Sequence, residues 1–370
     1  MQEASRPRGG RHADGHGARR SGHARSGDDA RDGRTAALES SVRVRAQRAA
    51  RRPSRRAVIR LAGALVVALA LSAEGADMKL TLGTATPGGG FPVYGDAVIA
   101  AVREVDPALQ IEPRNTKGST ENVPLLERNE LDLALVQGEV AYEALQGVGR
   151  APSPIRIVAA MYSTPGMFVV RADSPARTIE DLRGKPVAFG ARGSGLVLLA
   201  RYVLDGLGLD QERDFQAVYL ERAGDGPAMV QDGRVAALWG GGVGWPGFTA
   251  VAKAPGGARF IVPDADGLRK IQAKHPFLKP LTVPAGSYPG QDAPIQSLGS
   301  WSFIMARPGL SDDAAYRVAK ALHQAEAGIA QRLAQGKETT AANTAAAAPR
   351  AELIHPGVRR YLGELGLLTR

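Results

Sequence analysis

The chain has 370 residues, enough for about two domains of ordinary size, and a formal net charge of +10. Residues 1–76 contain 16 Arg and no Lys against 7 acidic residues, whereas residues 77–370 contain 31 basic and 30 acidic residues, so the nearly neutral body excludes a nucleic-acid-binding function based on a basic surface. The absence of cysteine excludes disulfides, thiolate metal sites, cysteine nucleophiles and a lipid-bearing cysteine anchor.

The first 76 residues are predicted to precede the folded body. Residues 1–50 are rich in Arg, Gly, Ala, Ser and Asp and poor in large apolar side chains. We therefore expect them to be disordered, or to be a leader upstream of the true translation start. A basic tail that binds a partner is the alternative.

Residues 51–76 are predicted to be a signal peptide. The charged segment Ser54–Arg60 is followed by 13 uncharged, mostly apolar residues, Leu61–Ala73. The Ser-Arg-Arg-x-Val-Ile-Arg order resembles a twin-arginine leader, and an ordinary secretory leader is the open alternative. Cleavage between Ser72 and Asp77 would release a chain with no stable membrane insertion, which we expect in the periplasm.

From Met78 onward, short β-type runs alternate with helical patterns, which predicts an α/β fold with mainly parallel sheets. Ser311, followed by two aspartates, is a helix-start signal. Residues 338–351 fit a helix or a loop. Strands are expected at 78–84, 108–113, 131–137, 155–160, 167–171, 186–190, 215–220, 235–239, 258–262 and 300–306. Helices are expected at about 92–105, 120–129, 195–208, 225–232, 311–335 and 356–365.

Two segments are candidate boundaries between lobes. One lies at Ser174-Pro175 and the other in the Pro- and Gly-rich segment 280–296. They predict a first lobe of residues 77–174, an inserted second lobe of residues 175–287, and a return to the first lobe over residues 288–370. Two chain connections would then act as a hinge.

At three joints, a short strand leads through a Gly- or Ser-rich turn into a helix. The turns are Pro87–Tyr94, Gly118–Asn122 and Gly193–Gly195. Small residues allow a close approach of backbone to ligand, and the free N–H groups of a helix start favour an anion. Because ligands of open α/β sheets bind at the carboxyl ends of strands, these joints predict two lobes that hold a small anion between them.

The candidate ligand-binding residues lie in and around these joints. For several of them an ordinary role stays open: Gly88–Gly90 as a tight turn, Ser119 or Thr120 as a helix cap, Arg192 as a surface residue and Trp239 as core. The candidates are Thr86, Gly88, Gly89, Gly90, Phe91, Tyr94, Ser119, Thr120, Asn122, Gln137, Arg192, Ser194, Gly195, Trp239, Gly242 and Tyr288.

The residues give little support to an enzyme. The body has three histidines, His275, His323 and His355, and no pair has metal-ligand spacing. Gly193–Gly195 lacks the flanking pattern of a nucleophile elbow, and Gly88–Gly90 is neither a phosphate loop nor a dinucleotide fingerprint. We predict no catalytic residue, no metal site and no cofactor.

Five motifs in chain order resemble the TAXI family, the solute receptors of tripartite TRAP transporters. The resemblance implies a two-lobed, type II periplasmic-binding-protein-like fold that closes on a dicarboxylate, a keto acid or an acidic amino acid such as glutamate. It implies a monomer that delivers its ligand to TRAP membrane subunits. A periplasmic sensor that signals to a membrane partner is the alternative. The motifs are Gly83–Gly95 (GTATPGGGFPVYG), Gly118–Asn122 with Leu131–Gln137 (GSTEN, LDLALVQ), Asp181–Gly190 with Gly193–Gly195 (DLRGKPVAFG, GSG), Pro284–Gln291 (PAGSYPGQ) and His355–Tyr361 (HPGVRRY).

The chain departs from the family pattern at positions that concern the ligand. Phe91 stands where members often have a tyrosine, and Leu196 where many have a threonine. The strand Val235–Leu238 lacks an aspartate that many members carry. The resemblance therefore implies a site that is more apolar than usual.

Overall fold

The computed structural model describes residues 77–368, and the predictions for residues 1–76 lie outside that range. The strands are β1 (Met78–Gly83), β2 (Leu109–Arg114), β3 (Leu133–Val136), β4 (Arg156–Arg171), β5 (Pro186–Ala191), β6 (Gln216–Leu220), β7 (Ala237–Gly241), β8 (Ala258–Ile261), β9 (Lys279–Val283) and β10 (Ile295–Ala306). The α-helices are α2 (Gly90–Val105), α3 (Ser119–Glu127), α4 (Gly138–Gln146), α5 (Gly195–Gly206), α6 (Gly226–Gln231), α7 (Pro246–Lys253), α8 (Ala265–Lys274), α9 (Asp312–Gln324), α10 (Glu326–Arg332), α11 (Ala341–Ala347) and α12 (Pro356–Glu364). Short 3-10 helices are η2 (Glu180–Leu182), η3 (Ala223–Asp225), η4 (Ala334–Glu338) and η5 (Ala351–Leu353).

The strands pair in the order β2-β1-β3-β10-β4-β7-β5-β6, with β8 beside β4 and β9 beside β10. In one group β1 is parallel to β2 and β3, and in the other β5 is parallel to β6 and β7. Helices connect the parallel strands, as right-handed crossover connections require. The predicted α/β class, with two mainly parallel groups of strands, is confirmed.

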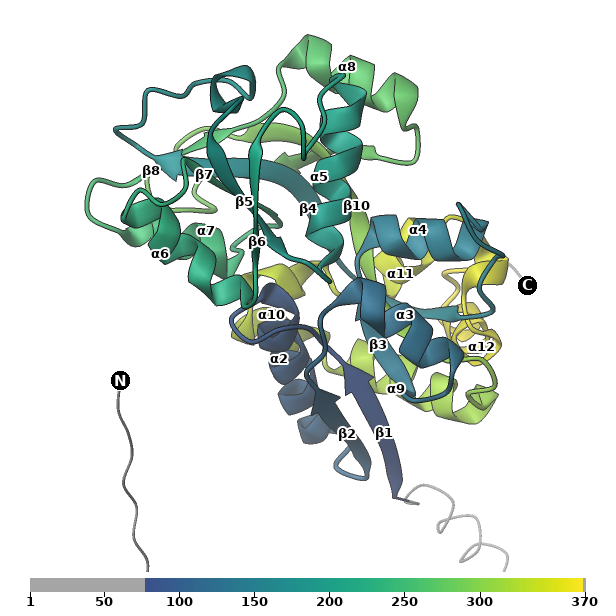
Figure 1. Cartoon of the computed structure of the whole chain (residues 1–370). Coiled ribbons are helices and arrows are strands. Elements are labelled where there is room, and N and C mark those ends of the chain that lie inside the picture. The colour runs from purple at the N-terminus through teal and green to yellow at the C-terminus, as the bar shows by residue number, and fades with distance from the viewer. Residues whose placement is uncertain (1–76, 369–370) are drawn as a thin grey trace, which may run out of the picture. The chain divides into compact units, whose positions relative to one another are not determined.

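Two long strands, β4 and β10, belong to both groups (Figure 1). Strand β4 pairs with β10 as far as Pro165 and with β7 from Gly166 onward. Strand β10 pairs with β9 over residues 295–299 and with β3 over residues 303–306. These antiparallel strands are the two connections between the groups, and the predicted lobe limits at residues 174 and 287 stay predictions.

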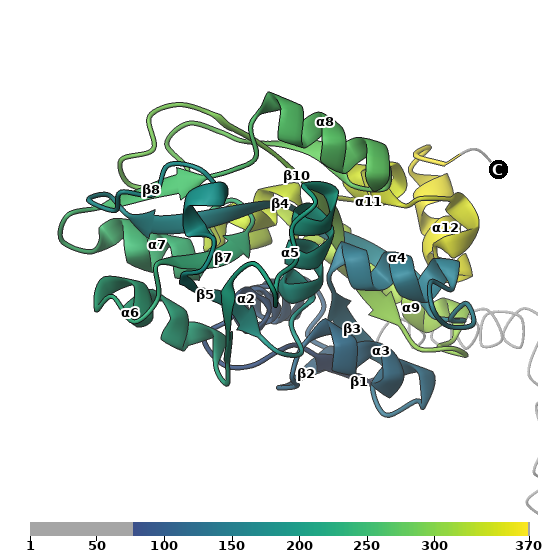
Figure 2. The ribbon, with the colours of Figure 1, turned by 45° about the horizontal axis from the view of Figure 1, so that its top comes forward.

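We call the elements around β1, β2 and β3 the first lobe, with α2–α4, α9–α12 and the adjoining halves of β4 and β10. The elements around β5, β6 and β7 are the second lobe, with α5–α8. Helices α4 and α5, one from each lobe, lie side by side in both views (Figures 1 and 2). The lobes therefore also meet through helices.

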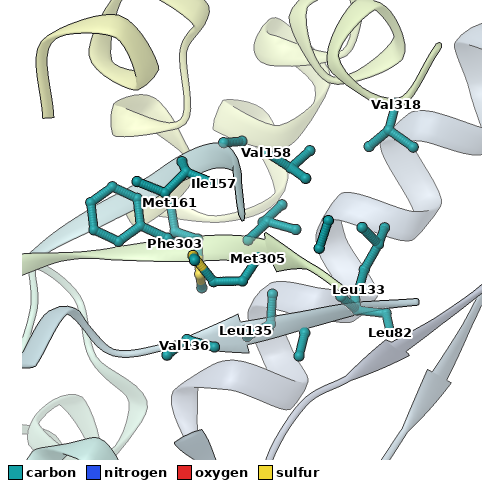
Figure 3. Close-up of a cluster of buried hydrophobic side chains, with 14 of the residues drawn as sticks. Leu82, Leu133, Leu135, Val136, Ile157, Val158, Met161, Phe303, Met305 and Val318 are labelled. Atoms are coloured by element: carbon teal, nitrogen blue, oxygen red, sulfur yellow. The ribbon is translucent and has the colours of Figure 1, made fainter. Parts of the chain in front are cut away.

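The first lobe is built on one large apolar cluster (Figure 3). Leu82 of β1 and the leucines and valine of β3 meet Met161 of β4, Phe303 of β10 and Val318 of α9, and these side chains are at most 4 % exposed. Burying one such side chain stabilises a fold by about 1.5–3 kcal/mol. This cluster fixes the carboxyl ends of β1 and β3; the first predicted joint follows β1, and the turn into α4 follows β3.

The second lobe has an aromatic centre. The rings of Phe168 and Trp239 pack edge-on with centroids 4.7 Å apart, and Phe189 packs on Phe168 at 6.1 Å. The indole N–H of Trp239 donates to the carbonyl of Leu196 at 2.8 Å. The predicted candidate Trp239 is therefore core, and it holds the first turn of α5.

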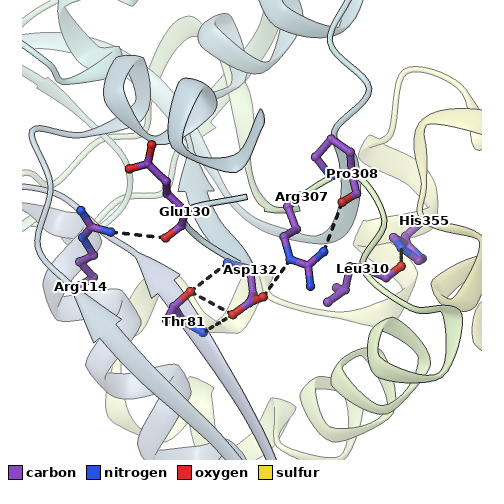
Figure 4. Close-up of polar contacts among 8 residues, drawn as sticks. All are labelled: Thr81, Arg114, Glu130, Asp132, Arg307, Pro308, Leu310 and His355. Atoms are coloured by element: carbon purple, nitrogen blue, oxygen red, sulfur yellow. Dashed lines mark hydrogen bonds and ion pairs between the residues drawn. The ribbon is translucent and has the colours of Figure 1, made fainter. Parts of the chain in front are cut away.

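Polar bonds join β1, β3 and the end of β10 at the far edge of the first lobe (Figure 4). Asp132 accepts from the backbone N–H of Thr81 at 2.9 Å and from Nε of Arg307 at 2.9 Å. Burial alone would raise the pKa of Asp132, but the hydrogen bonds from Thr81 and Arg307 outweigh it and lower that pKa. Nearby, His355 caps α12 and donates from Nε2 to the carbonyl of Leu310 at 3.0 Å.

Several predicted elements differ from the structure. Separate strands were predicted at 155–160 and 167–171, but the structure has the single strand β4 there. Pro165 lies within β4, at the point where the strand changes its pairing partner from β10 to β7. The single helix predicted over 311–335 is wrong: α9 ends at Gln324, and α10 and η4 follow. The open segment 338–351 contains α11. Helices α4, α7 and α8 and strand β9 were not predicted. Within residues 77–368, no helix has both the length and the apolar character needed to cross a membrane.

Candidate ligand-binding site

A cavity of about 40 Å³ lies between the lobes, where six joints between a strand and the following helix meet. Three of these joints belong to the first lobe and three to the second, and β4 runs beside them. All six follow the carboxyl end of a strand, which is the usual ligand position in open α/β sheets. The lining residues are Ala85, Thr86, Gly89, Gly90, Phe91, Gly118, Ser119, Gln137, Tyr162, Thr164, Ser194, Leu196, Ala223, Gly241 and Trp245.

Five helices begin at this cavity. The residues that precede their first turns, Gly89 of α2, Gly118 of α3, Gln137 of α4, Ser194 of α5 and Trp245 of α7, all line it. The first N–H groups of a helix have no partner within the helix and carry about half a positive charge. None of the fifteen lining residues has a charged side chain. The positive potential of the cavity therefore comes from the backbone.

Gln137 places a buried amide in the cavity wall. Its side chain is only 3 % exposed, and it interacts with the buried carboxyl of Glu139. Its backbone N–H donates to Oγ of Ser119 at 3.0 Å, which joins the starts of α3 and α4.

Aromatic side chains form the apolar part of the wall. Phe91, Tyr162 and Trp245 all line the cavity. A Cβ atom on Gly90 would lie 3.0 Å from Cδ1 of Trp245, so glycine lets the first turn of α2 approach this ring without displacing it. Burial raises the pKa of Tyr162 above its ordinary value, so its hydroxyl stays protonated at neutral pH.

The two lobes touch around the cavity. Both the backbone N–H and Oγ1 of Thr120 donate to the carbonyl of Gly193, at 3.2 Å and 3.1 Å. On the other side, the N–H of Ala223 donates to Oγ1 of Thr86 at 3.4 Å. A Cβ atom on Gly195 would lie 2.2 Å from Cβ of Gln137. The structure is therefore a closed arrangement of the lobes.

A buried carboxyl lies in the first turn of α4, close to this site. Glu139 has no exposed surface, and its Oε1 accepts a hydrogen bond from Oγ of Ser300 on β10 at 2.6 Å. Burial raises the pKa of Glu139 from 4.5 to about 7, and the hydrogen bonds from Ser300, from its own backbone and from the side chain of Gln137 only partly oppose this rise. The group is therefore largely neutral at slightly acid pH.

The structure brings seven of the predicted candidates together around the cavity, and they come from both lobes. Gly89 and Ser194, on which the prediction of a shared anion site depended, are among them. The seven are Thr86, Gly89, Gly90, Phe91, Ser119, Gln137 and Ser194.

Four of the other candidates hold the fold near the cavity without lining it. Tyr94 is buried and its hydroxyl bonds Oγ1 of Thr339 at 3.0 Å. The amide of Asn122 donates to two carbonyls, at the ends of β1 and β3, both at 2.8 Å. Tyr288 is buried, and its hydroxyl donates to the carbonyl of Gly242, itself a candidate, and accepts from the backbone N–H of Trp245.

The remaining candidates lie on the contact between the lobes, on the surface or in the core. Thr120 and Gly195 belong to the lobe contact described above, and Trp239 to the core. Gly88 has φ of 81° and faces Gly224 of the second lobe. Arg192 stacks over the ring of Tyr219, 4.6 Å from its centroid.

Eight lining residues were not predicted. Tyr162 and Thr164 come from the middle of β4, where the sequence gives no turn or capping signal. Trp245 ends the glycine-rich segment Trp239–Trp245, of which only Trp239 and Gly242 are predicted candidates. The others present only backbone or a small or apolar side chain. The eight are Ala85, Gly118, Tyr162, Thr164, Leu196, Ala223, Gly241 and Trp245.

Comparison with known families gives one match that spans most of the chain. The model of the NMT1-like family matches residues 82–366. The chain belongs to the NMT1-like family. The matched range includes every lining residue of the cavity, so the cavity of this NMT1-like chain is part of the family domain. This match shows the NMT1-like family, and the resemblance to the TAXI family stays a prediction.

Solved structures similar to the NMT1-like chain include three binding proteins. A substrate-binding protein of an amino acid ABC transporter is 13 % identical, with 70 % of this chain and 100 % of the other covered and a TM-score of 0.43. The aliphatic sulphonate binding protein SsuA from Escherichia coli is 20 % identical, with 77 % and 82 % covered and a TM-score of 0.43. A TctC solute binding protein from Polaromonas is 18 % identical, with 78 % and 98 % covered and a TM-score of 0.43.

Proposed function

We propose that this chain is an extracytoplasmic solute-binding receptor that captures a small organic anion between its lobes. Its ligand would come from the classes that the sequence resemblance implies: dicarboxylates, keto acids and acidic amino acids. It would deliver this ligand to the membrane subunits of a TRAP transporter of the TAXI type. The observation that carries the proposal is the convergence of five helix starts on one cavity with no charged side chain.

This arrangement suits reversible binding of an anion. A negative group at a helix start gains typically 0.3–1 kcal/mol per helix, and up to about 2 kcal/mol when partly buried. Several helix starts together can hold a carboxylate in a site from which water is excluded. The positive potential comes from helix starts and not from a charged side chain. Release of the ligand therefore leaves no unpaired charged side chain in the site.

The lining residues support binding without catalysis. The hydroxyl of Ser119 accepts a hydrogen bond from the backbone of Gln137, and that of Ser194 accepts one from Leu196. No histidine or carboxylate lines the cavity to act as a base for either hydroxyl. Ser194 caps α5, and Ser119 links the start of α3 to the backbone of Gln137; we propose that both hydroxyls also donate to the ligand.

The location and partners of the chain follow from the same proposal. A receptor of this kind works outside the cytoplasm, which agrees with the export signal predicted over residues 51–76, by the twin-arginine or the ordinary route. We propose a periplasmic monomer whose partners are the ligand and the membrane subunits, with no nucleic acid and no cofactor.

Binding is tested by differential scanning calorimetry and titration calorimetry with the purified protein against carboxylates, sulfonates, amino acids and uncharged amides. A true ligand at about 100 times its Kd should stabilise the protein by about 2.7 kcal/mol, seen as a rise in Tm. If no anion at millimolar concentration raises Tm or gives heat, the proposal fails.

The receptor and sensor alternatives differ in the membrane partner. We expect the ligand-loaded protein to bind a polytopic permease subunit in membranes of the source cell. Capture of a membrane histidine kinase instead would replace the transport function by signalling, while the anion site would be retained.

A further inference from the structure

Glu139 is a buried carboxyl beside the cavity. It is the second residue of α4, one of the five helices that begin at the cavity, and its side chain has no exposed surface. The described groups that bond its carboxyl are neutral: the hydroxyl of Ser300 at 2.6 Å, the side chain of Gln137 and the backbone N–H of Glu139 itself. A buried carboxylate without a positive partner is costly, so these surroundings favour the protonated form.

The start of α4 is shared between this carboxyl and the proposed anion. The free N–H groups of a helix start carry about half a positive charge. An ionised Glu139 takes up part of that charge, because it accepts from its own backbone N–H in the first turn. A ligand in the cavity would use the same helix start, since Gln137, the residue before the first turn, lines the cavity. The two negative groups therefore compete, and protonation of Glu139 leaves the start of α4 to the ligand.

The carboxyl of Glu139 lies directly behind the cavity wall. Gln137 lines the cavity, and its side chain bonds that carboxyl. In the closed arrangement the start of α5 covers Gln137, since a Cβ atom on Gly195 would lie 2.2 Å from Cβ of Gln137. Two negative charges repel each other more strongly in such a covered place than in water. A bound anion should therefore raise the pKa of Glu139 further, by about one unit or more.

The groups that face Glu139 from the neighbouring elements are neutral or negative. Burial is the main cause that raises its pKa to about 7, and Glu143, one turn further along α4, adds a negative charge that acts in the same direction. On α5, Tyr202 donates to Glu143 at 2.8 Å, and burial and this bond raise the pKa of Tyr202, so it stays neutral. Strand β10 and helix α3 contribute the hydroxyls of Ser300 and Ser119, which do not titrate near neutral pH.

We propose that the receptor takes up a proton together with its anion and that Glu139 is the site of this proton. This inference rests on the proposed function, since it adds a second bound species to the anion site. Glu139 acts through the start of α4 and through Gln137 without touching the ligand. Anion affinity should therefore rise as pH falls through the range in which Glu139 takes up its proton.

The experiment is titration calorimetry of the purified protein with pyruvate, 2-oxoglutarate and glutamate at pH 6.0, 7.5 and 8.5. Each titration is done in two buffers that differ in ionisation enthalpy, so that the heat reports proton uptake. The carboxyl groups of these anions do not titrate in this range, so an exchanged proton belongs to the protein. We expect the tightest of the three to bind about fivefold or more tightly at pH 6.0 than at pH 8.5, with uptake of about half a proton near pH 7.5.

A matched pair of variants assigns the proton. Glu139→Gln has the shape of the protonated side chain but no proton to exchange. It should therefore bind the same anion at pH 8.5 about as tightly as the wild type does at pH 6.0, without proton uptake. Glu143→Gln removes a negative charge from the same helix and retains Glu139, so it should keep the proton uptake. The two-buffer measurement on the wild type tests the uptake even if a variant does not fold.

The outcomes separate this inference from the proposed function. A Kd that is the same at pH 6.0 and pH 8.5, with a heat that does not depend on the buffer, overturns the inference and leaves an anion receptor. Proton uptake that persists in Glu139→Gln belongs to another group and also overturns it. No binding at pH 6.0 of any of these three anions, or of any anion in the wider panel, overturns the proposed function and the inference with it.

Discussion

Replacing Gly195 by alanine should hold the two lobes apart without disturbing either lobe. Gly195 is the first residue of α5, and its φ is not positive, so alanine fits its backbone. The atoms that an added Cβ would meet all belong to the opposite lobe: Cβ of Gln137 at 2.2 Å, its Cγ at 2.7 Å and Oγ of Ser119 at 3.2 Å. The added methyl group therefore acts only on the closed arrangement.

The size of the effect follows from the overlap. Carbon atoms in contact lie about 3.5–4.0 Å apart, so the lobes must separate by about 1.3 Å or more at this point. Overpacking of a fitted contact costs typically 1–3 kcal/mol, which corresponds to a loss of affinity of about 5- to 150-fold. Alanine also gives the unfolded chain less conformational entropy than glycine does. The folded protein with open lobes should therefore gain about 0.4–1 kcal/mol of stability.

The assay uses the absence of cysteine from the chain. Spin labels on Asp96→Cys in the first lobe and Glu221→Cys in the second, both exposed, report the distance between the lobes by pulsed electron resonance. Without Gly195→Ala, the tightest-binding anion should shorten this distance, and titration calorimetry should give its Kd. With Gly195→Ala, we expect a longer distance and a weaker Kd.

A matched control is Gly363→Ala on α12, where an added Cβ meets no atom within 4 Å. This variant should keep the wild-type Kd and label distance. If Gly195→Ala also closes to the wild-type distance with a Kd within about twofold, the lobes do not close through this contact, and the reasoning is refuted.

Three further predictions concern buried polar groups. Glu139→Gln should remove a pH dependence of the free energy of unfolding. Because the folded-state pKa of Glu139, about 7, lies above the ordinary value of 4.5, the folded protein holds the proton more tightly than the unfolded chain does. The free energy of unfolding of the wild type should therefore fall by roughly 3 kcal/mol as pH rises from about 4.5 to about 7. Urea denaturation at several pH values measures this, and an equal slope in wild type and variant would contradict it. Tyr288→Phe should leave the carbonyl of Gly242 and the N–H of Trp245 without their partner, and a loss of about 1–3 kcal/mol in urea denaturation is expected; a loss below about 0.5 kcal/mol would mean that water replaces the hydroxyl. Ser194→Ala should cost about 1 kcal/mol of stability by removing the cap of α5, and calorimetry should also show weaker anion binding; unchanged affinity would place the ligand away from α5.

The sequence predicted the fold best where the signals are local. The turns Pro87–Tyr94, Gly118–Asn122 and Gly193–Gly195 each join a strand to a helix, as their small residues and the flanking periodicity indicated. Ser311 does begin α9, with its hydroxyl accepting from Ala314. The break of that helix at Ala325 has no Gly or Pro at that position to indicate it.

Helices were missed both with and without a typical start signal. Helix α4 begins after Gln137, which is not a common cap, whereas α7 has Pro246 at its first position, a signal that was present in the sequence. Helix α8 was also missed although Asp264 caps it by accepting from Gly267, so this signal was present in the sequence. Strand β4 passes through Pro165, which in a sequence is typical of a strand end.

For the candidate site, sequence could indicate the joints but not the direction of each side chain. Phe91, Gln137 and Ser194 lie on the cavity, whereas Tyr94 and Asn122, one turn further along their helices, are tied into the first lobe. Such a difference depends on the exact angle of each helix relative to its strand. The contribution of β4 depends on sheet pairing between segments far apart in the chain, which no local pattern contains.

The cavity wall contains small polar residues and aromatic residues, and these two groups should differ in how readily they change when the ligand changes during evolution. Thr86, Ser119, Thr164 and Ser194 are small, and exchanges between Ser and Thr at these positions alter recognition while they keep the hydroxyls that bond Ala223, Gln137, Ser302 and Leu196. The aromatic wall is different, because its rings are also members of the apolar clusters of the lobes. New specificities within the family should therefore arise first at the small polar positions, while the aromatic frame persists between relatives with different ligands.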